Sequence, residues 1–579
     1  MLQGFYWDSF IDTHWTRLTS QAEELATYFD LIWVPQSGNC YYDNQMGYMP
    51  IYYFNHDSSF GSEKELRQMI STFRERGLGT IADVVINHRG QRNTWSVIPT
   101  ETYKGETYQF LSTDICKNDD DNSTQSWAAS KGLSLSENND TGEGWGDAFD
   151  LDHKSANVNK TIKAYLYFLL NDLGYTGFRY DMVKGYSASF TADYNTAVHP
   201  KFSVGECWDG STTIKNWING TKDSNGVPTS AAFDFQFRYR VRDALHRNDW
   251  RLLSASNESE QGRPLIYDAD YRPYAVTFVE NHDTERRSNA EQDPLKSDTL
   301  AANAFMLAMP GTPCVFLKHW KAKKSEIKRM ISVRKLVGLH NQSTFEILNS
   351  ESMRFVVQTT GRQGSLICAV GKTASSYTAP QGFTKVVSGL DYAYFIPDAL
   401  VSQWNPIEQR IAAEDEAELA AREAFQPHTA TIYVRDELNW SSMNYYVWDS
   451  NNNTQLNGGW PGKEITSTVE IDGYTWYYQT FNVSSPDYYF NMVLSTGSGS
   501  PQTVDILGLS EDHFFVVKNK TFAAKYMAED CTPSTGVTSP MASPREKGGL
   551  YDLTGRKVRT EQPLSKGIYI QNGKKLFIK

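Results

Sequence analysis

The sequence lacks the features that would place it in a membrane. No run approaches about 18 consecutive apolar residues, which a membrane-spanning helix needs, and the longest compact apolar stretch is "AYLYFLL". The first residues, "MLQGFYWDSF", do not show the charged and then apolar pattern of a signal peptide. We therefore expect no transmembrane segment. Because "LQGFYW" has the pattern of a strand, we expect the chain to begin where a leader was removed or missed.

Cysteine is scarce, and its spacing excludes two kinds of site. The sequence has no CxxC pair and no cysteine near a histidine cluster, so it predicts neither a zinc site nor a dense disulfide framework. Each cysteine is expected to be a small, buried, apolar side chain. The six are Cys40, Cys116, Cys207, Cys314, Cys368 and Cys531.

Clusters of basic residues are absent as well. The net charge of −12 and the lack of a basic stretch interleaved with aromatics argue against nucleic acid as a partner. Aromatic residues are abundant instead, with 15 Trp, 33 Tyr and 29 Phe. Aromatic rings suit the apolar faces of sugars, but they also fill protein cores. The composition therefore raises carbohydrate binding as a hypothesis without deciding it.

The order of apolar and amphipathic segments predicts a barrel. The 579 residues suffice for several domains of roughly 150 residues each. Up to about residue 335, short apolar runs alternate with helical segments such as 62–76 and 157–173. Eight strands joined by helices describe a parallel (β/α)8 TIM barrel, an α/β fold. The predicted strands are 2–7, 31–34, 78–86, 177–183, 202–206, 231–235, 276–280 and 313–317.

Shifts in composition set the other boundaries. The barrel is predicted at 1–88 and 156–335, with an inserted domain at 89–155, after the third strand, because that segment is too long for a bare loop. Alternating apolar runs at 336–398 predict an antiparallel β-domain. The remaining predicted units are a charged helical linker or spacer at 399–428, a β-sandwich module at 429–518, a Pro/Ser/Thr-rich linker at 519–547 and a tail at 548–579.

Polar residues stand at the ends of four predicted strands. In "GFRYDMVKGY", alternation of side chains places Arg179 and Asp181 on one face, and such a buried pair is usually neutral or costly for stability. Polar residues also end "DVVINH", "VGE" and "FVENHD". Catalytic groups of a TIM barrel lie at these carboxyl ends. The residues expected to converge there are Asp83, Asn87, His88, Arg179, Asp181, Glu206, His282 and Asp283.

In this order, the four stretches resemble the four sequence regions of the α-amylase family, glycoside hydrolase family 13. The resemblance is closest to plant-type α-amylases, in the segments "GYMP", "IADVVINHR", "GFRYDMVKGY", "FVENHDT" and "GTPC". It covers nearly all of residues 2–398. The resemblance implies a retaining enzyme that hydrolyses internal α-1,4-glucosidic bonds of starch and related glucans.

The resemblance also implies roles for three carboxylates. Asp181 matches the nucleophile, Glu206 the acid/base and Asp283 the third carboxylate, which engages sugar hydroxyls. A retaining enzyme attacks the anomeric carbon with one carboxylate and protonates the leaving oxygen with a carboxylic acid about 5 Å away. We expect Arg179 to keep Asp181 ionised by lowering its pKa, and apolar neighbours such as Trp208 to raise the pKa of Glu206. Taken singly, each acid would more often be a solvated surface group.

Further residues match substrate-binding positions. Tyr48 matches the ring that stacks on the sugar just before the cut, and His88 and His282 match histidines that hydrogen-bond this sugar. Lys184 would reach a sugar on the leaving-group side, whereas Asp83 is expected to brace the neighbouring arginine. Each of these rings could instead have only a packing role.

A calcium ion is implied as cofactor. Calcium prefers several oxygen ligands from carboxylates and carbonyls. Asn87, Asp140 and Asp150 match the family's ligands, with the backbone carbonyls of Glu143 and Gly185 as additions. The ion would clamp the inserted domain onto the barrel. The open alternative is that these Asx-rich loops only cap turns.

The C-terminal segments have resemblances of their own. "NYYVWDSNNNTQLNGGWPG" is similar to a starch-binding module of the family 26 type, in which Tyr446, Trp448 and Trp460 would form a platform for glucan; the alternative is that they are core aromatics. The tail, "LYDLTGRKV" through "GIYIQNGKKLFIK", resembles the sorting domain of type IX secretion substrates in Bacteroidetes, which implies an extracellular or cell-surface location. Its alternative is an accessory strand pair.

Two competing hypotheses remain at this stage. One is a related family 13 enzyme that acts on pullulan, cyclodextrins or maltooligosaccharides, or a transglycosylase. The other is a non-enzymatic glucan-binding protein with a degenerate barrel, which would be expected to have lost one of the three carboxylates. Starch and other α-1,4-glucans are the expected substrates. The protein is expected to be a monomer.

Overall fold

The computed structural model describes most of the chain. The described residues are 1–40, 42–90, 99–119, 123–146, 148–287, 291–522 and 524–532, with the tail strands 550–552, 567–571 and 574–578.

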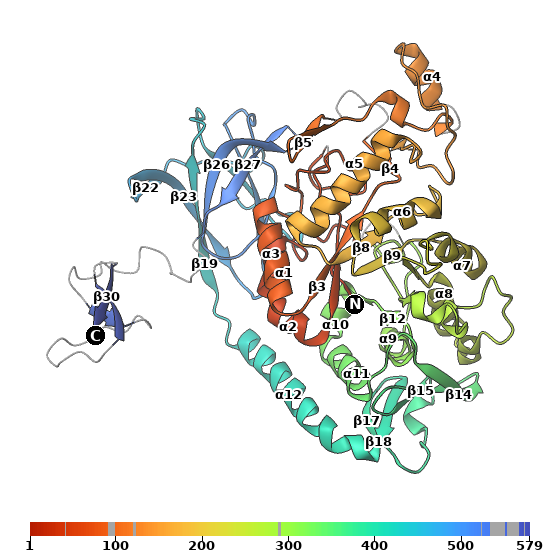
Figure 1. Cartoon of the computed structure of the whole chain (residues 1–579). Coiled ribbons are helices and arrows are strands. Elements are labelled where there is room, and N and C mark those ends of the chain that lie inside the picture. Colours follow the sequence, from red (N-terminus) through yellow and green to blue (C-terminus); the bar gives the residue numbers. More distant parts are fainter. Residues whose placement is uncertain are drawn as a thin grey trace.

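A closed parallel sheet forms the centre of the molecule (Figure 1). β12 (Thr312–Pro313) and β13 (Val315–Phe316) lie on either side of Cys314 and are two parts of one strand. The first part pairs with β11 and the second with β1, so this strand closes the sheet and confirms the predicted eight-stranded barrel. The other barrel strands, in sheet order, are β11 (Ala275–Thr277), β10 (Ala231–Phe233), β9 (Phe202–Gly205), β8 (Gly177–Tyr180), β3 (Gly79–Val84), β2 (Leu31–Val34) and β1 (Leu2–Gln3).

Most barrel strands end earlier than predicted, and β8 shows why. The prediction extended this strand to residue 183, but it stops at Tyr180. Met182 has φ +43°, in the left-handed region that strands do not use. The backbone therefore turns directly after Asp181, at the carboxyl end of the barrel.

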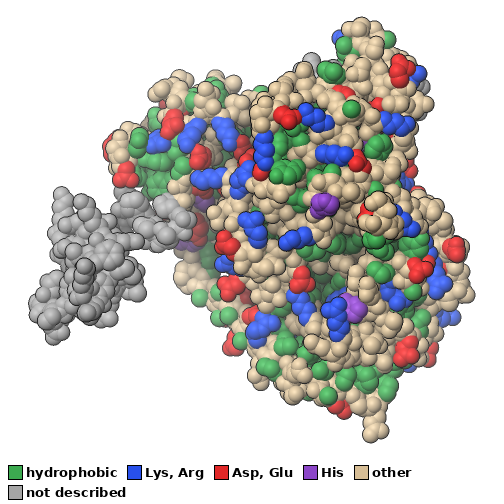
Figure 2. All heavy atoms as spheres, in the orientation of Figure 1, with side chains coloured by type: hydrophobic (Ala, Val, Ile, Leu, Met, Phe, Trp, Pro, Cys, Tyr) green, Lys and Arg blue, Asp and Glu red, His purple; other side chains and the backbone are tan. Residues whose placement is uncertain are grey.

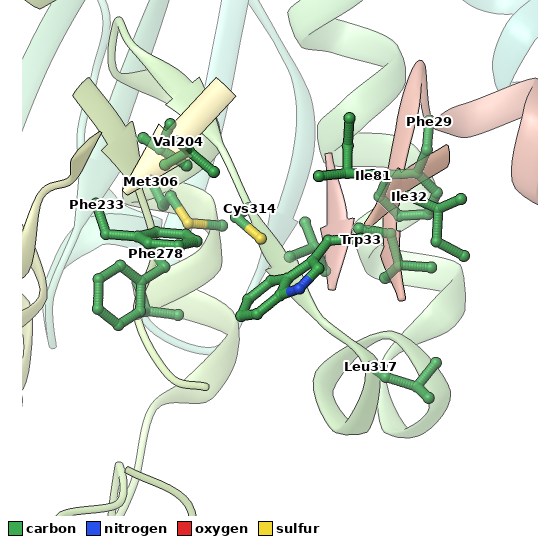
Figure 3. Packing of buried hydrophobic residues seen from close by; sticks show 14 of the residues in the cluster. Phe29, Ile32, Trp33, Ile81, Val204, Phe233, Phe278, Met306, Cys314 and Leu317 are labelled. Atoms are coloured by element: carbon green, nitrogen blue, oxygen red, sulfur yellow. The ribbon is translucent and has the colours of Figure 1, made fainter. Parts of the chain in front are cut away.

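Aromatic residues pack the barrel interior (Figure 3). The ring centroids of Trp33 and Phe233 lie 5.5 Å apart, and those of Phe233 and Phe278 also lie 5.5 Å apart. The Trp33 indole donates from Nε1 to Oδ2 of Asp83 (3.1 Å). The core is thus continuous with the polar residues at the strand ends.

Helices cover the outside of the barrel, and α3 (Glu63–Glu75) shows how the sequence sets their starts. Ser62 and Glu65 form a capping box at its N-terminus, and apolar side chains at helical spacing bury one face. α5 (Ala156–Tyr167) continues as a π-helical turn at Phe168–Leu173. The other barrel helices are α1 (Trp15–Ser20), α2 (Ala22–Tyr28), α6 (Ala188–Val198), α7 (Ser211–Gly220), α8 (Phe235–Arg247), α9 (Thr299–Ala308), α10 (Leu317–Ala322) and α11 (Lys324–Val337).

Two smaller units flank the barrel. The insertion after β3 holds the antiparallel pair β4 (His88–Arg89) and β7 (Phe149–Asp150), the hairpin β5 (Glu101–Tyr103) and β6 (Glu106–Tyr108), and α4 (Ser123–Ser130). After α11, five antiparallel strands confirm the predicted β-domain. They are β14 (Thr344–Glu351), β15 (Arg354–Thr360), β16 (Ser365–Val370), β17 (Phe383–Gly389) and β18 (Tyr392–Pro397).

The helix α12 (Asp398–Glu423) is packed against the barrel rather than being a free spacer. Leu400, Trp404 and Ile411 are buried, and the charged face of the helix pairs with α11. Lys328 Nζ, for example, lies 3.0 Å from Glu414 Oε2. The predicted linker is therefore helical as expected, but it lies along the barrel (Figure 1).

The module after α12 is a two-sheet sandwich. One sheet contains β22 (Thr468–Ile471), β23 (Tyr474–Val483), β19 (His428–Asp436), β26 (His513–Phe522) and β27 (Lys525–Asp530), and the other β21 (Lys463–Glu464), β20 (Asn444–Asp449), β24 (Phe490–Ser495) and β25 (Ile506–Leu509). Both sheets contribute to one buried apolar cluster.

The predicted end of this module at residue 518 is too early. β26 continues past that residue and β27 pairs with it, which moves the boundary to about residue 530, since hydrogen bonding and not composition ends the sheet. Most of the predicted linker, 533–547, lies outside the described residues. In the tail, β28 (Leu550–Asp552), β29 (Gly567–Gln571) and β30 (Lys574–Ile578) form an antiparallel sheet.

Charge is mixed on one face of the molecule. On the face shown in Figure 2, basic and acidic side chains of the described residues are interspersed. None of the helices in the described ranges combines the length and apolarity that a bilayer crossing requires.

Candidate active site

A pocket of about 440 Å³ brings most of the predicted site residues together. Its wall is formed by side chains from the loops after several barrel strands, together with residues of the inserted domain. Asn87, Asp140 and Asp150 do not line it, and Arg179 lies beneath it. The predicted residues that line the pocket are Tyr48, His88, Glu143, Asp181, Lys184, Gly185, Glu206, His282 and Asp283.

One buried guanidinium beneath the pocket contacts three carboxylates. Arg179 Nη1 donates to Asp181 Oδ1 (2.6 Å) and to Asp83 Oδ1 (2.9 Å). Arg179 Nη2 lies 2.9 Å from Glu206 Oε1. The indole of Trp33 packs against the same guanidinium, 4.9 Å from ring centroid to Cζ. The arginine therefore fixes the positions of Asp181 and Glu206 relative to each other.

Burial dominates the proton affinities of these acids. It raises the pKa of Glu206 to about 8 and the pKa values of Asp181 and Asp83 to about 6. The Arg179 charge works in the opposite direction on each, but it is shared among three carboxylates. Arg179 thus lowers the pKa of Asp181 as expected, but burial outweighs this effect and the net pKa is raised; the raised pKa of Glu206 agrees with expectation.

A hydrogen-bonded chain joins Tyr48 to Asp283 through His282. Gln3 Nε2 donates to His282 Nδ1 (2.9 Å), which leaves the Nε2 hydrogen of His282 to face Tyr48 Oη (2.7 Å) and Asp283 Oδ2 (3.1 Å). Tyr48 in turn donates to Asp83 Oδ2 (3.1 Å). Burial lowers the pKa of His282 to about 4, so the ring is neutral at physiological pH.

His88 and Lys184 already have protein partners. His88 Nε2 donates to the Tyr48 carbonyl (2.8 Å), so this ring supports the backbone of Tyr48 as well as lining the pocket. Lys184 Nζ lies 2.8 Å from Glu143 Oε1 and 3.1 Å from Asp209 Oδ2. The lysine therefore joins the inserted domain to the loop after β9.

Sequence reasoning missed three aromatic or basic residues around the pocket. Trp7 lies nearly parallel to Tyr48, with ring centroids 6.0 Å apart, and Arg287 Cζ lies over the Trp7 ring, 3.9 Å from its centroid. Trp145 of the inserted domain lies 4.6 Å from the His88 ring. Trp7 directly follows "LQGFY" at the first strand, so its position at a strand end was the available signal.

Comparison with known proteins identifies the family. A family model described as the alpha-amylase catalytic domain matches residues 32–319. The "Alpha-amylase type B isozyme" of Hordeum vulgare is 35% identical over 127 residues, 21% of this chain and 77% of that protein. The "Probable alpha-amylase 2" of Arabidopsis thaliana is 29% identical over 409 residues, 68% of this chain and 92% of that protein. The chain belongs to the α-amylase family. It is a glycoside hydrolase of the α-amylase type.

Other relatives of this α-amylase-family enzyme carry different activities in their names. The "Glucan 1,4-alpha-maltotetraohydrolase" of Stutzerimonas stutzeri is 26% identical over 398 residues, 64% of this chain and 67% of that protein. Family membership therefore does not by itself fix the product.

The predicted cation ligands of the enzyme gather beside the pocket, where the inserted domain meets the barrel. Asn87 Nδ2 donates to Asp150 Oδ1 (3.1 Å), while Asp150 Oδ2 is buried without a hydrogen-bond partner. Burial, followed by the charges of Asp119 and Asp140, raises the pKa of Asp150 to about 9. A side chain on Gly185 would meet Asn87 Oδ1 at 1.8 Å, so the Asn87 side chain packs directly against the Gly185 backbone.

These observations fit a cation-binding site. An unpartnered carboxylate oxygen among like charges is costly unless a positive ion neutralises it. The described residues contain no group of three or more His, Cys, Asp or Glu side chains placed to hold a metal ion, so the amide and backbone carbonyls would have to complete the coordination.

In the appended module, the three predicted aromatic residues lie together. The ring centroid of Tyr446 is 5.4 Å from that of Trp448 and also 5.4 Å from that of Trp460. Their neighbours Tyr445 and Val447 point into the sandwich core, so the predicted residues face outward. Trp460 is 48% exposed.

Proposed function

We propose that this enzyme hydrolyses internal α-1,4-glucosidic bonds of starch and related glucans with retention, using Asp181 as nucleophile and Glu206 as acid/base. The observation that carries the proposal is the single buried guanidinium of Arg179, which holds both carboxylates at the base of the pocket. Retaining hydrolysis needs two carboxyl groups close together, about 5 Å apart. Asp283, in the loop after β11, is proposed as the third carboxylate that binds sugar hydroxyls.

The chemistry proceeds in two displacements. Asp181 attacks the anomeric carbon while Glu206 gives its proton to the departing glycosidic oxygen, so one C–O bond forms and one breaks. Glu206, now ionised, accepts a proton from water, and the resulting hydroxide displaces Asp181 from the anomeric carbon. The raised pKa of Glu206 keeps this acid protonated near neutral pH, which the first step requires.

The surrounding residues are proposed to orient the sugar. The Tyr48 and Trp7 rings offer flat apolar surfaces, and His282, held neutral, can donate a hydrogen bond to a sugar hydroxyl in place of its bond to Tyr48. His88 would bind the same sugar, and Lys184 would bind one on the leaving-group side. Asp83 supports Arg179 and Tyr48 rather than the substrate.

The direct test is Asp181→Asn. We expect hydrolysis of soluble starch to fall by more than about 1,000-fold, because removing a nucleophile eliminates the covalent route. Sedimentation with insoluble starch should show unchanged binding. Asp223→Asn, on an exposed loop, serves as the control. Activity of the Asp181→Asn variant near that of the control would refute the nucleophile assignment.

Product analysis separates this function from its relatives. Internal cleavage lowers the viscosity of a starch solution rapidly and gives mixed oligosaccharides. A single small product, or products longer than the substrate, would instead favour an exo-acting enzyme or a transglycosylase.

We propose further that calcium binds where Asn87, Asp140 and Asp150 meet the backbone of Glu143 and Gly185. Bound calcium would neutralise these acids and hold the inserted domain against the barrel. Calcium should raise the melting temperature of the enzyme, and Asp150→Ala should abolish that rise. An equal calcium effect in both proteins would place the ion elsewhere.

The C-terminal units are proposed to deliver the enzyme to its substrate. The Tyr446, Trp448 and Trp460 cluster would bind starch as a family 26 type module, and the tail sheet would serve as a type IX sorting domain that directs export to the cell surface or medium. A fusion of residues 548–579 to a reporter should be exported only by cells with that secretion system. The enzyme is expected to be a monomer, which light scattering can test.

A further inference from the structure

The module contacts the barrel at two different places through the same strand, β27. Lys525 Nζ lies 2.6 Å from Asp43 Oδ2, in the long loop between β2 and α3. Glu529 Oε1 lies 3.6 Å from Lys64 Nζ, in the first turn of α3. The first contact reaches the loop that carries Tyr48, whereas the second reaches only an outer helix. Figure 1 shows β26 and β27 beside α1 and α3.

The two ion pairs differ in their exposure to solvent. The Lys525 and Asp43 side chains are 28% and 17% exposed, but the Lys64 and Glu529 side chains are 81% and 40% exposed. Exposed pairs are screened by water and hold geometry weakly. The contact at Asp43 is therefore the stronger constraint on position.

Further contacts reinforce the junction beside Asp43. Asn44 Nδ2 donates to Asp505 Oδ2 of the module (3.1 Å). Leu507 of β25 packs against the apolar core cluster of the barrel, and a side chain on Gly508 would approach Ile11 to 3.0 Å. The module thus holds two adjacent residues of the loop, Asp43 and Asn44, from a packed surface.

The chain between this junction and the pocket is short and tightly packed. Gly47 has φ +107°, and a Cβ there would lie 2.6 Å from the Gln36 Cβ, so the backbone has little room to shift. One residue later, Tyr48 contacts His282 and Asp83. A displacement at residue 43 would therefore be transmitted to the Tyr48 ring rather than absorbed.

We propose that Asp43, held by Lys525, is a positioning residue for Tyr48, so that the module braces the active site as well as binding starch. This inference rests on the proposed role of Tyr48 in orienting the sugar. A module that only tethers the enzyme would raise the local substrate concentration and leave the cleavage of short soluble glucans unchanged. A module that braces the loop contributes to their cleavage too.

The test uses maltoheptaose, a short soluble glucan, and the full chain. Asp43→Asn and Lys525→Met should each lower kcat/KM about 3- to 10-fold, mainly through kcat, because the sugar at Tyr48 is distorted in the transition state. Lys64→Gln removes the exposed ion pair between α3 and Glu529 of β27. This variant should keep kcat/KM at the wild-type value. The exchanged pair Asp43→Lys with Lys525→Asp should recover at least half of the loss.

The outcomes are distinguishable. Lys525 lies outside the barrel. A lower kcat/KM of Lys525→Met on maltoheptaose, at an unchanged melting temperature, therefore supports the proposal that the module braces the active site. Wild-type kinetics in both single variants would overturn the inference, as would an equal loss in Lys64→Gln or no recovery in the exchanged pair. Failure of the wild-type enzyme to cleave any α-1,4-glucan would instead overturn the proposed function.

Discussion

At the scale of single residues, the site is organised by a charge imbalance around Arg179. One buried cation faces three carboxylates, so at least part of this group must stay protonated in the folded enzyme. The sequence predicted which of these residues meet, since strand periodicity and position at strand ends are local. It did not predict the net pKa shift of Asp181, because burial depends on the packing of Trp33 and other residues far away in the chain.

This imbalance makes stability dependent on pH. Glu206 has a folded-state pKa of about 8 against an ordinary value of 4.5, so the folded enzyme holds this proton more tightly than the unfolded chain. Its contribution to stability is fully present below about pH 4.5 and is lost as pH rises toward 8. We expect the melting temperature of the wild type to fall over this range more steeply than that of Glu206→Gln, which imitates the protonated acid.

Differential scanning calorimetry from pH 4.5 to 8 measures this difference. Glu416→Gln, a change of the same type on an exposed helical position, should follow the wild type. Parallel curves for the wild type and Glu206→Gln would contradict the raised pKa of the buried acid.

At the scale of elements, α12 shows the limit of composition as a guide. Its charged sequence predicted a helix correctly, but the same charges suggested a solvated spacer. In the structure these charges pair with barrel helices. Lys328 of α11, which is 2% exposed, lies 3.0 Å from Glu414 Oε2 of α12 and 2.8 Å from Glu24 Oε1 of α2. Which surface a charged helix meets depends on the tertiary fold, which the local sequence does not report.

Glu414→Gln tests this docking. Glu414 also accepts a hydrogen bond from Tyr28 Oη (2.6 Å), so its loss weakens contacts to two barrel helices. We expect a destabilisation of about 1–2 kcal/mol, seen as earlier thermal unfolding and faster proteolysis between α12 and the barrel. Glu416→Gln on the same helix is the matched control, and equal behaviour of the two variants would show that the docking contributes no stability.

At the scale of the whole molecule, the order of the structural units along the chain could largely be predicted from the sequence. The barrel and the antiparallel domain are confirmed because apolar periodicity determines them. The end of the sandwich at residue 518 was misplaced because β27 lacks a strong apolar alternation, and its pairing with β26 only becomes visible in three dimensions.

The two functions proposed for the module, starch binding and bracing of the Tyr48 loop, can be distinguished by the substrate used. Trp460→Ala should lower the hydrolysis of granular starch about 5- to 10-fold, in line with the loss of about 1–1.5 kcal/mol of aromatic contact, and leave maltoheptaose cleavage unchanged. Binding isotherms on starch granules provide the second measurement. The exposed Tyr474, on the other sheet, is the control, since Tyr474→Ala should affect neither substrate. Equal losses on both substrates for Trp460→Ala would contradict a platform that acts only in binding.

Closure of the barrel through β13 also affects how the chain folds during its synthesis. β1 pairs with a strand more than three hundred residues further along, so this edge stays open until most of the catalytic domain has been synthesised. At about 5–20 residues per second, translation leaves the outer edge of β1 unpaired for roughly 15 to 60 s. An open edge of this kind recruits other strands. Yield of the enzyme should therefore depend on chaperones that shield nascent chains, and the dependence should be greater in a slowly translating host.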